Sequence, residues 1–119
     1  MRTALLALIV AIPAVANAQS HYLDIYNTAP SSLVAIAVAP AGSGDFRDIP
    51  LGGKALHGGG DSTTVAVRAD GGCLRDLRLS FVDGRVIEHN QFNVCRYRSY
   101  HTGRYWRAAE PNPKFTVQR

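Results

Sequence analysis

Arginine and aromatic side chains alternate near the carboxyl end of this chain, in the stretch best suited to chemistry with a ligand. Residues 96–107 read RYRSYHTGRYWR and contain no acidic residue. Arginine presents forked donors to phosphate, sulfate and carboxylate groups, while tyrosine and tryptophan rings stack on bases or sugar rings. The segment predicts contact with an anionic polymer or an acidic partner protein. The candidate binding residues are Arg96, Arg98, Arg104, Trp106 and Arg107.

Two short motifs in a glycine-rich stretch are similar to pieces of hydrolase active sites. His57 begins a His-Gly-Gly-Gly segment like the oxyanion-hole loop of esterases, and residues 60–62 read Gly-Asp-Ser. The esterase mechanism also needs a G-x-S-x-G nucleophile elbow, whereas Gly42-Ser43-Gly44 has the wrong spacing. The residues after Ser62 alternate as in a strand, where the second signature needs a helix. A small hydrolase is therefore only the weaker alternative.

The four histidines do not form a metal-ligand pattern. His21, His57, His89 and His101 are not spaced as i, i+2 or i, i+4 pairs, and the only methionine is the first residue. Both cysteines are expected to be oxidised, so thiolate ligands are excluded as well. His21 would be the best-placed ligand, but the sequence predicts no metal site and no cofactor.

Asp76 is an acidic residue inside the predicted strand of residues 73–82. Catalysis by paired carboxylates needs a second group with a different environment, and the sequence does not place one near it. We expect Asp76 to form a cross-strand ion pair with an arginine such as Arg68. No catalytic residue is predicted, and the protein is expected not to be an enzyme.

Charge is unevenly distributed along the chain. Residues 19–95 contain six basic and eight acidic residues, whereas residues 96–119 contain six basic residues and one acidic residue. The positive charge therefore belongs to the carboxyl-terminal segment. Such an asymmetry bears on the choice of partner rather than on the fold.

The first eighteen residues have the layout of a secretory signal peptide. Arg2 supplies a positive charge, residues 4–15 are apolar, and Ala16-Asn17-Ala18 fits signal peptidase. The apolar run is shorter than the ~20 residues that span a membrane, and Pro13 interrupts it. We expect cleavage after Ala18, a periplasmic or secreted location, and no transmembrane segment.

Period-two alternation and turn residues dominate the mature chain, which predicts an all-β domain. Removing residues 1–18 leaves 101 residues, enough for one domain with a modest core. In residues 33–39 the larger side chains Val34, Ile36 and Val38 are expected on one face. Residues 46–61 contain five glycines and are expected to be irregular. The predicted strands cover residues 22–27, 33–39, 62–68, 73–82 and 86–95.

The last two predicted strands form a hairpin that the two cysteines constrain. Asp83-Gly84 is a favoured turn dipeptide because glycine accepts a positive φ. An even number of cysteines in a small exported chain predicts a disulfide. A two-residue Asp83-Gly84 turn sets Cys73 opposite Val94, whereas a three-residue Asp83-Gly84-Arg85 turn or a bulge within the strands sets it opposite Cys95. We favour the second register.

The order of these elements resembles a group of small exported bacterial proteins of uncharacterised function. The resemblance covers residues 22–95 and is carried mainly by Cys73, an Asp-Leu-Arg tripeptide, Asp83-Gly84 and an Asn-x-Cys end at Cys95. It implies a disulfide-closed β domain in the bacterial envelope. It implies no activity, and it does not extend to residues 96–119.

Together these observations predict a small antiparallel β-sandwich or partly open barrel of five or six strands. Residues 1–18 form the signal peptide, residues 19–95 the β domain with its Cys73–Cys95 disulfide, and residues 96–119 a basic aromatic extension. We expect a non-enzymatic binding or accessory protein of the bacterial envelope. Nucleic acid is disfavoured because export leads away from the cytoplasm. An inhibitor that inserts residues 58–61 into an envelope-directed enzyme is an alternative.

Overall fold

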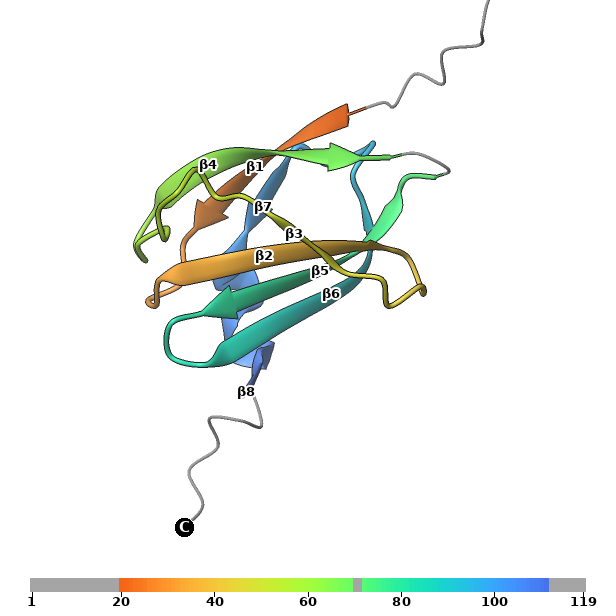
Figure 1. The fold of residues 1–119 in the computed structure, drawn as a ribbon. Helices are drawn as coiled ribbons and strands as arrows, with labels where there is room; N and C mark the ends of the chain where they lie inside the picture. Colours follow the sequence, from red (N-terminus) through yellow and green to blue (C-terminus); the bar gives the residue numbers. More distant parts are fainter. Residues whose placement is uncertain (1–19, 70–71, 112–119) are drawn as a thin grey trace, which may run out of the picture.

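The computed structural model describes residues 20–69 and 72–111, which form two β-sheets packed face to face (Figure 1). The three-stranded sheet has the order β4-β1-β7, from Asp61–Arg68, Ser20–Asn27 and Ser99–His101. The five-stranded sheet has the order β3-β2-β5-β6-β8, from Arg47–Ile49, Leu33–Pro40, Leu74–Phe81, Arg85–Asn93 and Glu110–Pro111. The predicted all-β sandwich is confirmed.

Two predictions fall outside the described residues: the signal peptide at residues 1–18 and the last part of the extension, residues 112–119. Within residues 20–69 and 72–111, no helix has the length and hydropathy needed to cross a membrane. The described part has eight strands rather than five or six, because β3, β7 and β8 are only two or three residues long. Strands this short carry too little alternation to be recognised in a sequence.

The five longer strands lie where the sequence alternation places them, with ends that differ by one or two residues. In β1 the residues Leu23, Ile25 and Asn27 are buried between the sheets. In β4 the buried residues are Val65 and Val67. Alternate residues of a strand point to opposite faces, so these side chains make one wall of the core.

A bulge changes the expected face pattern in β2. The register against β5 shifts between Leu33 and Ala35, so that Leu33 and Ile36 are both buried. Val34, which was expected on the same face as Ile36, is instead 46% exposed. One extra residue in a strand moves the residues before it to the opposite face.

The β5–β6 hairpin has a different turn and register from those expected. Val82, Asp83 and Gly84 form a three-residue loop, in which Gly84 has the positive φ that was anticipated. Close to the turn, Ser80 pairs with Val86. Further along, a bulge in β6 adds one residue, and Gln91 has a φ of 59° there.

The predicted disulfide is confirmed, but the two cysteines are not directly opposite. Cys73 accepts a hydrogen bond from the backbone N–H of Val94, so Cys95 lies one residue beyond its cross-strand position. The chain turns after Asn93, whose side-chain oxygen accepts the backbone N–H of Cys95. This turn brings the two Cα atoms within 5.4 Å, and the bond forms without direct pairing.

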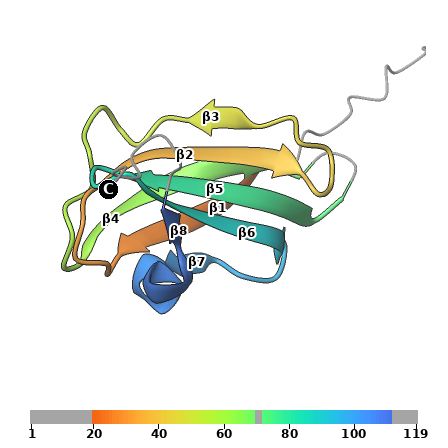
Figure 2. The same cartoon turned by 90° about the horizontal axis from the view of Figure 1, so that it is seen from below.

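The core continues beyond Cys95, where the sequence placed the end of the β domain. β7 pairs with β1, and this pairing is parallel, in contrast to the all-antiparallel sheet that was expected. Two 3₁₀ turns follow, η1 at Thr102–Arg104 and η2 at Trp106–Ala108. Tyr100 is only 2% exposed and lies among the core residues. Residues 99–109 are therefore part of the sandwich, and Figure 2 shows them along one side of it.

Candidate binding site

The segment of residues 96–107, called here the basic aromatic segment, is attached to β1 and to Thr28, the residue that follows it. The backbone N–H of Asp24 donates to the carbonyl of Arg98. The N–H of Gly103 donates to Oγ1 of Thr28, and a Cβ at Gly103 would lie 2.6 Å from that same oxygen. Glycine is the residue that permits this approach, so the segment has one position against the sheet.

A fully buried polar pair holds the same region together from the inside. Asn27 and Thr102 are both 0% exposed, and the Thr102 hydroxyl donates to Oδ1 of Asn27 at 2.8 Å. The Asn27 amide donates to the carbonyls of Ser31 and Leu56, each at 2.8 Å. Buried polar groups are costly unless they are hydrogen-bonded, and here each of these is. The network joins residues 75 positions apart, and no local sequence signal marks it.

A groove of about 410 Å³ lies between the end of β6 and the basic aromatic segment. We call it the aromatic groove. Its lining consists of aromatic and imidazole rings with one guanidinium group and one serine: His89, Phe92, Tyr97, Ser99, Tyr100, His101, Arg104 and Tyr105. Tyr97 is 50% exposed and offers its ring to solvent. The arrangement supplies flat apolar surfaces for a ring and a forked donor for an anion.

The floor of the aromatic groove is a cluster of packed rings. Tyr100 stacks on Tyr105 with ring centroids 5.1 Å apart, and His89 meets Phe92, Tyr100 and Tyr105 edge-on. Nδ1 of His89 lies 3.2 Å from the Tyr100 hydroxyl, which donates to it when that nitrogen is unprotonated. Burial lowers the pKa of His89, and burial followed by the neighbouring Tyr105 raises the pKa of Tyr100. Both groups are thereby favoured in their neutral forms.

The five predicted binding residues occupy different environments. Arg96, Arg98, Arg104 and Arg107 are all exposed, and Arg104 is the arginine that lines the groove. Arg96 lies over the ring of Tyr97, with Cζ 5.5 Å from the ring centroid. Trp106 packs edge-on against Phe81, with ring centroids 4.8 Å apart, and Cζ of Arg85 lies 4.6 Å from the centroid of the Trp106 ring. The Trp106 ring therefore closes the core.

His89 and Phe92 were not identified from the sequence, although both line the groove. They lie three residues apart, so strict alternation would put them on opposite faces of β6. The bulge at Gln91 places both on the groove side. The only sequence signal is the break in the period-two pattern, in which Ile87 and His89 are followed by Phe92 and Val94.

The glycine-rich loop that is similar to an oxyanion hole has its N–H groups occupied. Gly59 donates to the carbonyl of Ala29 at 3.1 Å, and Gly60 donates to the carbonyl of Asn27 at 2.9 Å. His57 instead contacts the Asp61 carboxylate, with Nδ1 3.3 Å from Oδ2. An oxyanion hole needs free N–H donors aimed at the substrate, and these two donors are committed to the loop.

Asp76 accepts its described hydrogen bonds from backbone groups, in place of the arginine pairing that was expected. Its oxygens accept the N–H of Gly42 at 2.9 Å and the N–H of Gln91 at 3.0 Å. These two bonds, with the Gly42 bond the stronger cause, lower the pKa of Asp76 despite the opposing effect of burial. The carboxylate therefore ties the β2–β3 loop to the β6 bulge and has a structural role.

Two of the four histidines, His89 and His101, line the aromatic groove, and His21 and His57 lie elsewhere. His21 approaches the disulfide, with Nε2 3.6 Å from Sγ of Cys95, and His101 stacks on Tyr26 at 4.8 Å. In the described part of the chain, no three His, Cys, Asp or Glu side chains come together as ligands for a metal ion.

Comparisons of the chain with family models, with curated proteins and with solved structures find no match.

Proposed function

We propose that this protein is an exported, non-enzymatic binding module whose ligand is an anionic polymer of the bacterial envelope. The ligand contacts the exposed arginines of the basic aromatic segment and places a ring in the aromatic groove. Export is supported by the signal-like residues 1–18, which lie outside the described residues, and by the Cys73–Cys95 disulfide. An acidic partner protein would use the same arginines.

One observation carries this proposal. Four exposed arginines lie within a segment that has no acidic residue from position 96 to position 109, and one of them, Arg104, lines a groove of aromatic rings. Charges that only keep a surface solvated do not need aromatic rings beside them. A polyanion with sugar rings can bind the arginines through its anionic groups and stack its rings on the aromatic side chains.

The test compares two single charge reversals by retention on heparin and on immobilised lipopolysaccharide. Arg104→Glu alters the groove, and Arg47→Glu makes the same charge change on β3, away from the segment. Truncation at Cys95 would not serve, because it removes Tyr100 and Thr102 from the core. We expect Arg104→Glu to elute at clearly lower salt and Arg47→Glu to elute close to the parent.

Salt dependence gives a second readout of the same contacts. For a duplex-like polyanion the logarithm of affinity should fall with the logarithm of salt by about 0.9 per neutralised phosphate. Replacing Arg96, Arg98 and Arg104 one at a time should reduce that slope by about one unit each. Equal retention of all variants on both supports would remove the basis of this function.

An enzyme inhibitor is the second candidate, favoured by the glycine-rich loop. Gly59 and Gly60 are exposed, while their N–H groups are fixed to Ala29 and Asn27. An exposed loop whose backbone is hydrogen-bonded to the domain suits insertion into a cleft, because little ordering entropy is lost on binding. Binding of an enzyme by the Arg104→Glu variant, together with its loss in a Gly60→Asp variant that remains folded, would favour this candidate.

A further inference from the structure

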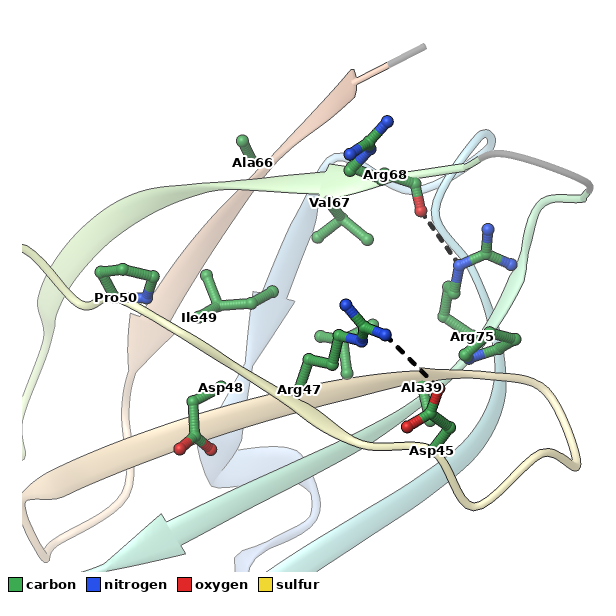
Figure 3. A pocket seen from close by; sticks show the side chains of 12 residues that line it. Ala39, Asp45, Arg47, Asp48, Ile49, Pro50, Ala66, Val67, Arg68 and Arg75 are labelled. Carbon is green, nitrogen blue, oxygen red and sulfur yellow. Dashed lines mark hydrogen bonds and ion pairs between the residues drawn. The ribbon is translucent and has the colours of Figure 1, made fainter. Parts of the chain in front are cut away.

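A cleft of about 530 Å³ opens on the other side of the sandwich, between the edges of β3 and β4 (Figure 3). It arises because a three-stranded sheet faces a five-stranded one, so that the inner face of β2 and β3 extends past β4. Val38 and Ile49 on that inner face are only partly buried. The lining combines apolar side chains with charged ones, including Val38, Ile49, Pro50, Val67, Arg47 and Arg68.

β4 lines this cleft with its last three residues, Ala66, Val67 and Arg68. The strand is eight residues long and pairs with β1 on one side, and within the described residues no strand pairs with its other side. Such an edge leaves alternate N–H and C=O groups unpaired and can accept a further strand. At the end of β4, the carbonyl of Arg68 already accepts Nε of Arg75 at 3.0 Å, so a new strand would pair with the residues before it.

Arg47 lies on the inner face of the sheet, where a closed sandwich has apolar residues. It pairs across the strands with Val38, and Ile49 pairs with the fully buried Ile36, which defines that face. Nevertheless the Arg47 side chain is 83% exposed, because the cleft is open to solvent. Figure 3 shows it pointing into the gap together with Ile49, while Ala66 and Arg68 lie on the opposite side of β4 from Val67.

The ion pair between Arg47 and Asp45 is weak, so the Arg47 guanidinium can still bind another carboxylate. The nearest carboxylate oxygen, from Asp45, is 3.9 Å away, and that side chain is also largely exposed. Exposed pairs at this distance contribute little. Asp48 also lines the cleft, but it lies between Arg47 and Ile49 in β3, and Figure 3 shows its carboxylate turned away from Arg47. A carboxylate entering the cleft can take the Arg47 guanidinium as a forked partner.

We propose that this cleft is a docking site for an extended segment of a partner protein, which adds to the β4 edge as a strand. Alternate apolar side chains of the segment pack on Val38 and Ile49, and an acidic side chain reaches Arg47. The site lies on the opposite side of the sandwich from the basic aromatic segment (Figure 2) and does not depend on the function proposed for that segment.

A peptide segment fits the cleft better than a second copy of this chain. In a copy, the side chains of β4 that face inward, Val65 and Val67, are already 2% and 1% exposed within its own core. Pairing of two β4 edges would therefore leave the cleft empty. Only a strand that is not already part of a sandwich can place its side chains between β3 and β4.

The first experiment selects ligands from randomised octapeptides displayed on phage, using the disulfide-bonded protein as bait. We expect enrichment of peptides with apolar residues at alternate positions and one acidic residue between or beside them. Absence of that pattern would overturn the proposal and would leave Arg47 as a charge that keeps other strands away from the edge.

The second experiment measures the best synthetic peptide by fluorescence anisotropy. N-methylation of alternate peptide amides removes strand pairing without changing side chains, and Arg47→Glu reverses the charge of the contact. Each change should weaken binding at least tenfold, while Arg104→Glu, in the other site, should leave binding unchanged. Equal affinity after methylation, or after Arg47→Glu, would overturn the proposal.

A sedimentation measurement on the protein alone tests whether a second copy of this chain occupies the cleft. A monomer at micromolar concentration is expected. A dimer that Arg47→Glu dissociates would overturn the peptide proposal and identify a second copy as the occupant.

Discussion

The two sheets of this sandwich differ in width on two sides, and side chains fill the space between the sheets on only one of them. On both sides the three-stranded sheet ends before the five-stranded sheet does. On the β7 side, Tyr100 and Thr102 are buried and Trp106 packs against Phe81. On the β4 side, the three-residue strand β3 leaves a cleft, and Ile49 is only partly buried.

Residue size explains this difference. Residues 97–106 include three tyrosines and a tryptophan, which are large enough to fill the space between two sheets. Residues 47–67 contain no phenylalanine, tyrosine or tryptophan and include five glycines. The chain therefore closes the first side with aromatic side chains, and on the second side it has none to use. Closure of the first side supports the fold, and the open second side is available to a partner.

The largest effect should come from removing the central ring of the closed side. Tyr100→Ala deletes a buried aromatic side chain and should lower the free energy of unfolding by about 3–5 kcal/mol. Ile49→Ala on the open side should cost less, about 1 kcal/mol, because water already reaches that site. Urea denaturation of both variants measures the difference. Similar losses for the two variants would contradict the distinction between a closed and an open side.

Removal of the disulfide should have the next largest effect. Replacing both Cys73 and Cys95 with alanine releases a loop whose ends are 22 residues apart and should cost about 3 kcal/mol. Since the bond lies just before the closing segment, hydrogen exchange should rise first in residues 99–109. Thiol titration of the denatured, unreduced parent should find no free thiol at these positions. An unchanged exchange rate in residues 99–109 would show that the disulfide does not help to hold this segment against the sheets.

The closed side also shows where sequence reasoning succeeds and where it fails. The five longer strands were predictable because alternation and turn residues are local, and Gly84 takes the positive φ that the hairpin needs. The parallel pairing of β7 with β1 was not predictable, since it joins residues about 75 positions apart. The same holds for the contact between Asn27 and Thr102.

The candidate sites were predictable to different degrees. Composition alone identified the arginines and tyrosines of the basic aromatic segment, and the structure places Arg104 in a groove. His89 and Phe92 join that groove because of the bulge at Gln91, a feature that depends on the bond to Asp76 and on no local motif. The β3–β4 cleft follows from the unequal width of two sheets, which only the assembled topology reveals.

A smaller effect is expected at Asp76, which holds the loop leading toward the open side. Asp76→Asn keeps the shape but turns one acceptor into a donor, so one backbone N–H loses its partner. The cost should be about 1–3 kcal/mol, against about 0.5 kcal/mol or less for the exposed control Asp45→Asn. Urea denaturation at neutral pH measures both. Equal stability of the two variants would show that these bonds contribute nothing net.

The lowered pKa of Asp76 adds a dependence on pH. In the folded state the pKa of Asp76 lies below 3.8, its ordinary value, which the carboxyl group has in the unfolded chain. The stabilisation is therefore complete above pH 3.8 and is lost as the pH falls below it. The parent should lose its advantage over Asp76→Asn in that acidic range. A constant difference from pH 7 to pH 2 would contradict the assignment.

The smallest expected effect is the titration of His89, and it tests how well the closed side excludes water. Burial among Phe92, Tyr100 and Tyr105 disfavours the imidazolium and lowers the pKa of His89 from its ordinary 6.5. In the unfolded chain the ring takes up a proton more readily, so stability from this group is complete above pH 6.5. It declines as the pH falls from 6.5 toward the folded-state pKa.

NMR titration of the imidazole resonances, assigned by comparison with His89→Phe, gives the folded-state midpoint directly. A midpoint below 6.5 in the parent is expected, together with a rise toward 6.5 when Tyr105→Ala opens the cluster to solvent. A midpoint at or above 6.5 in the parent would mean that water reaches His89, and that the side we describe as closed is open at this ring.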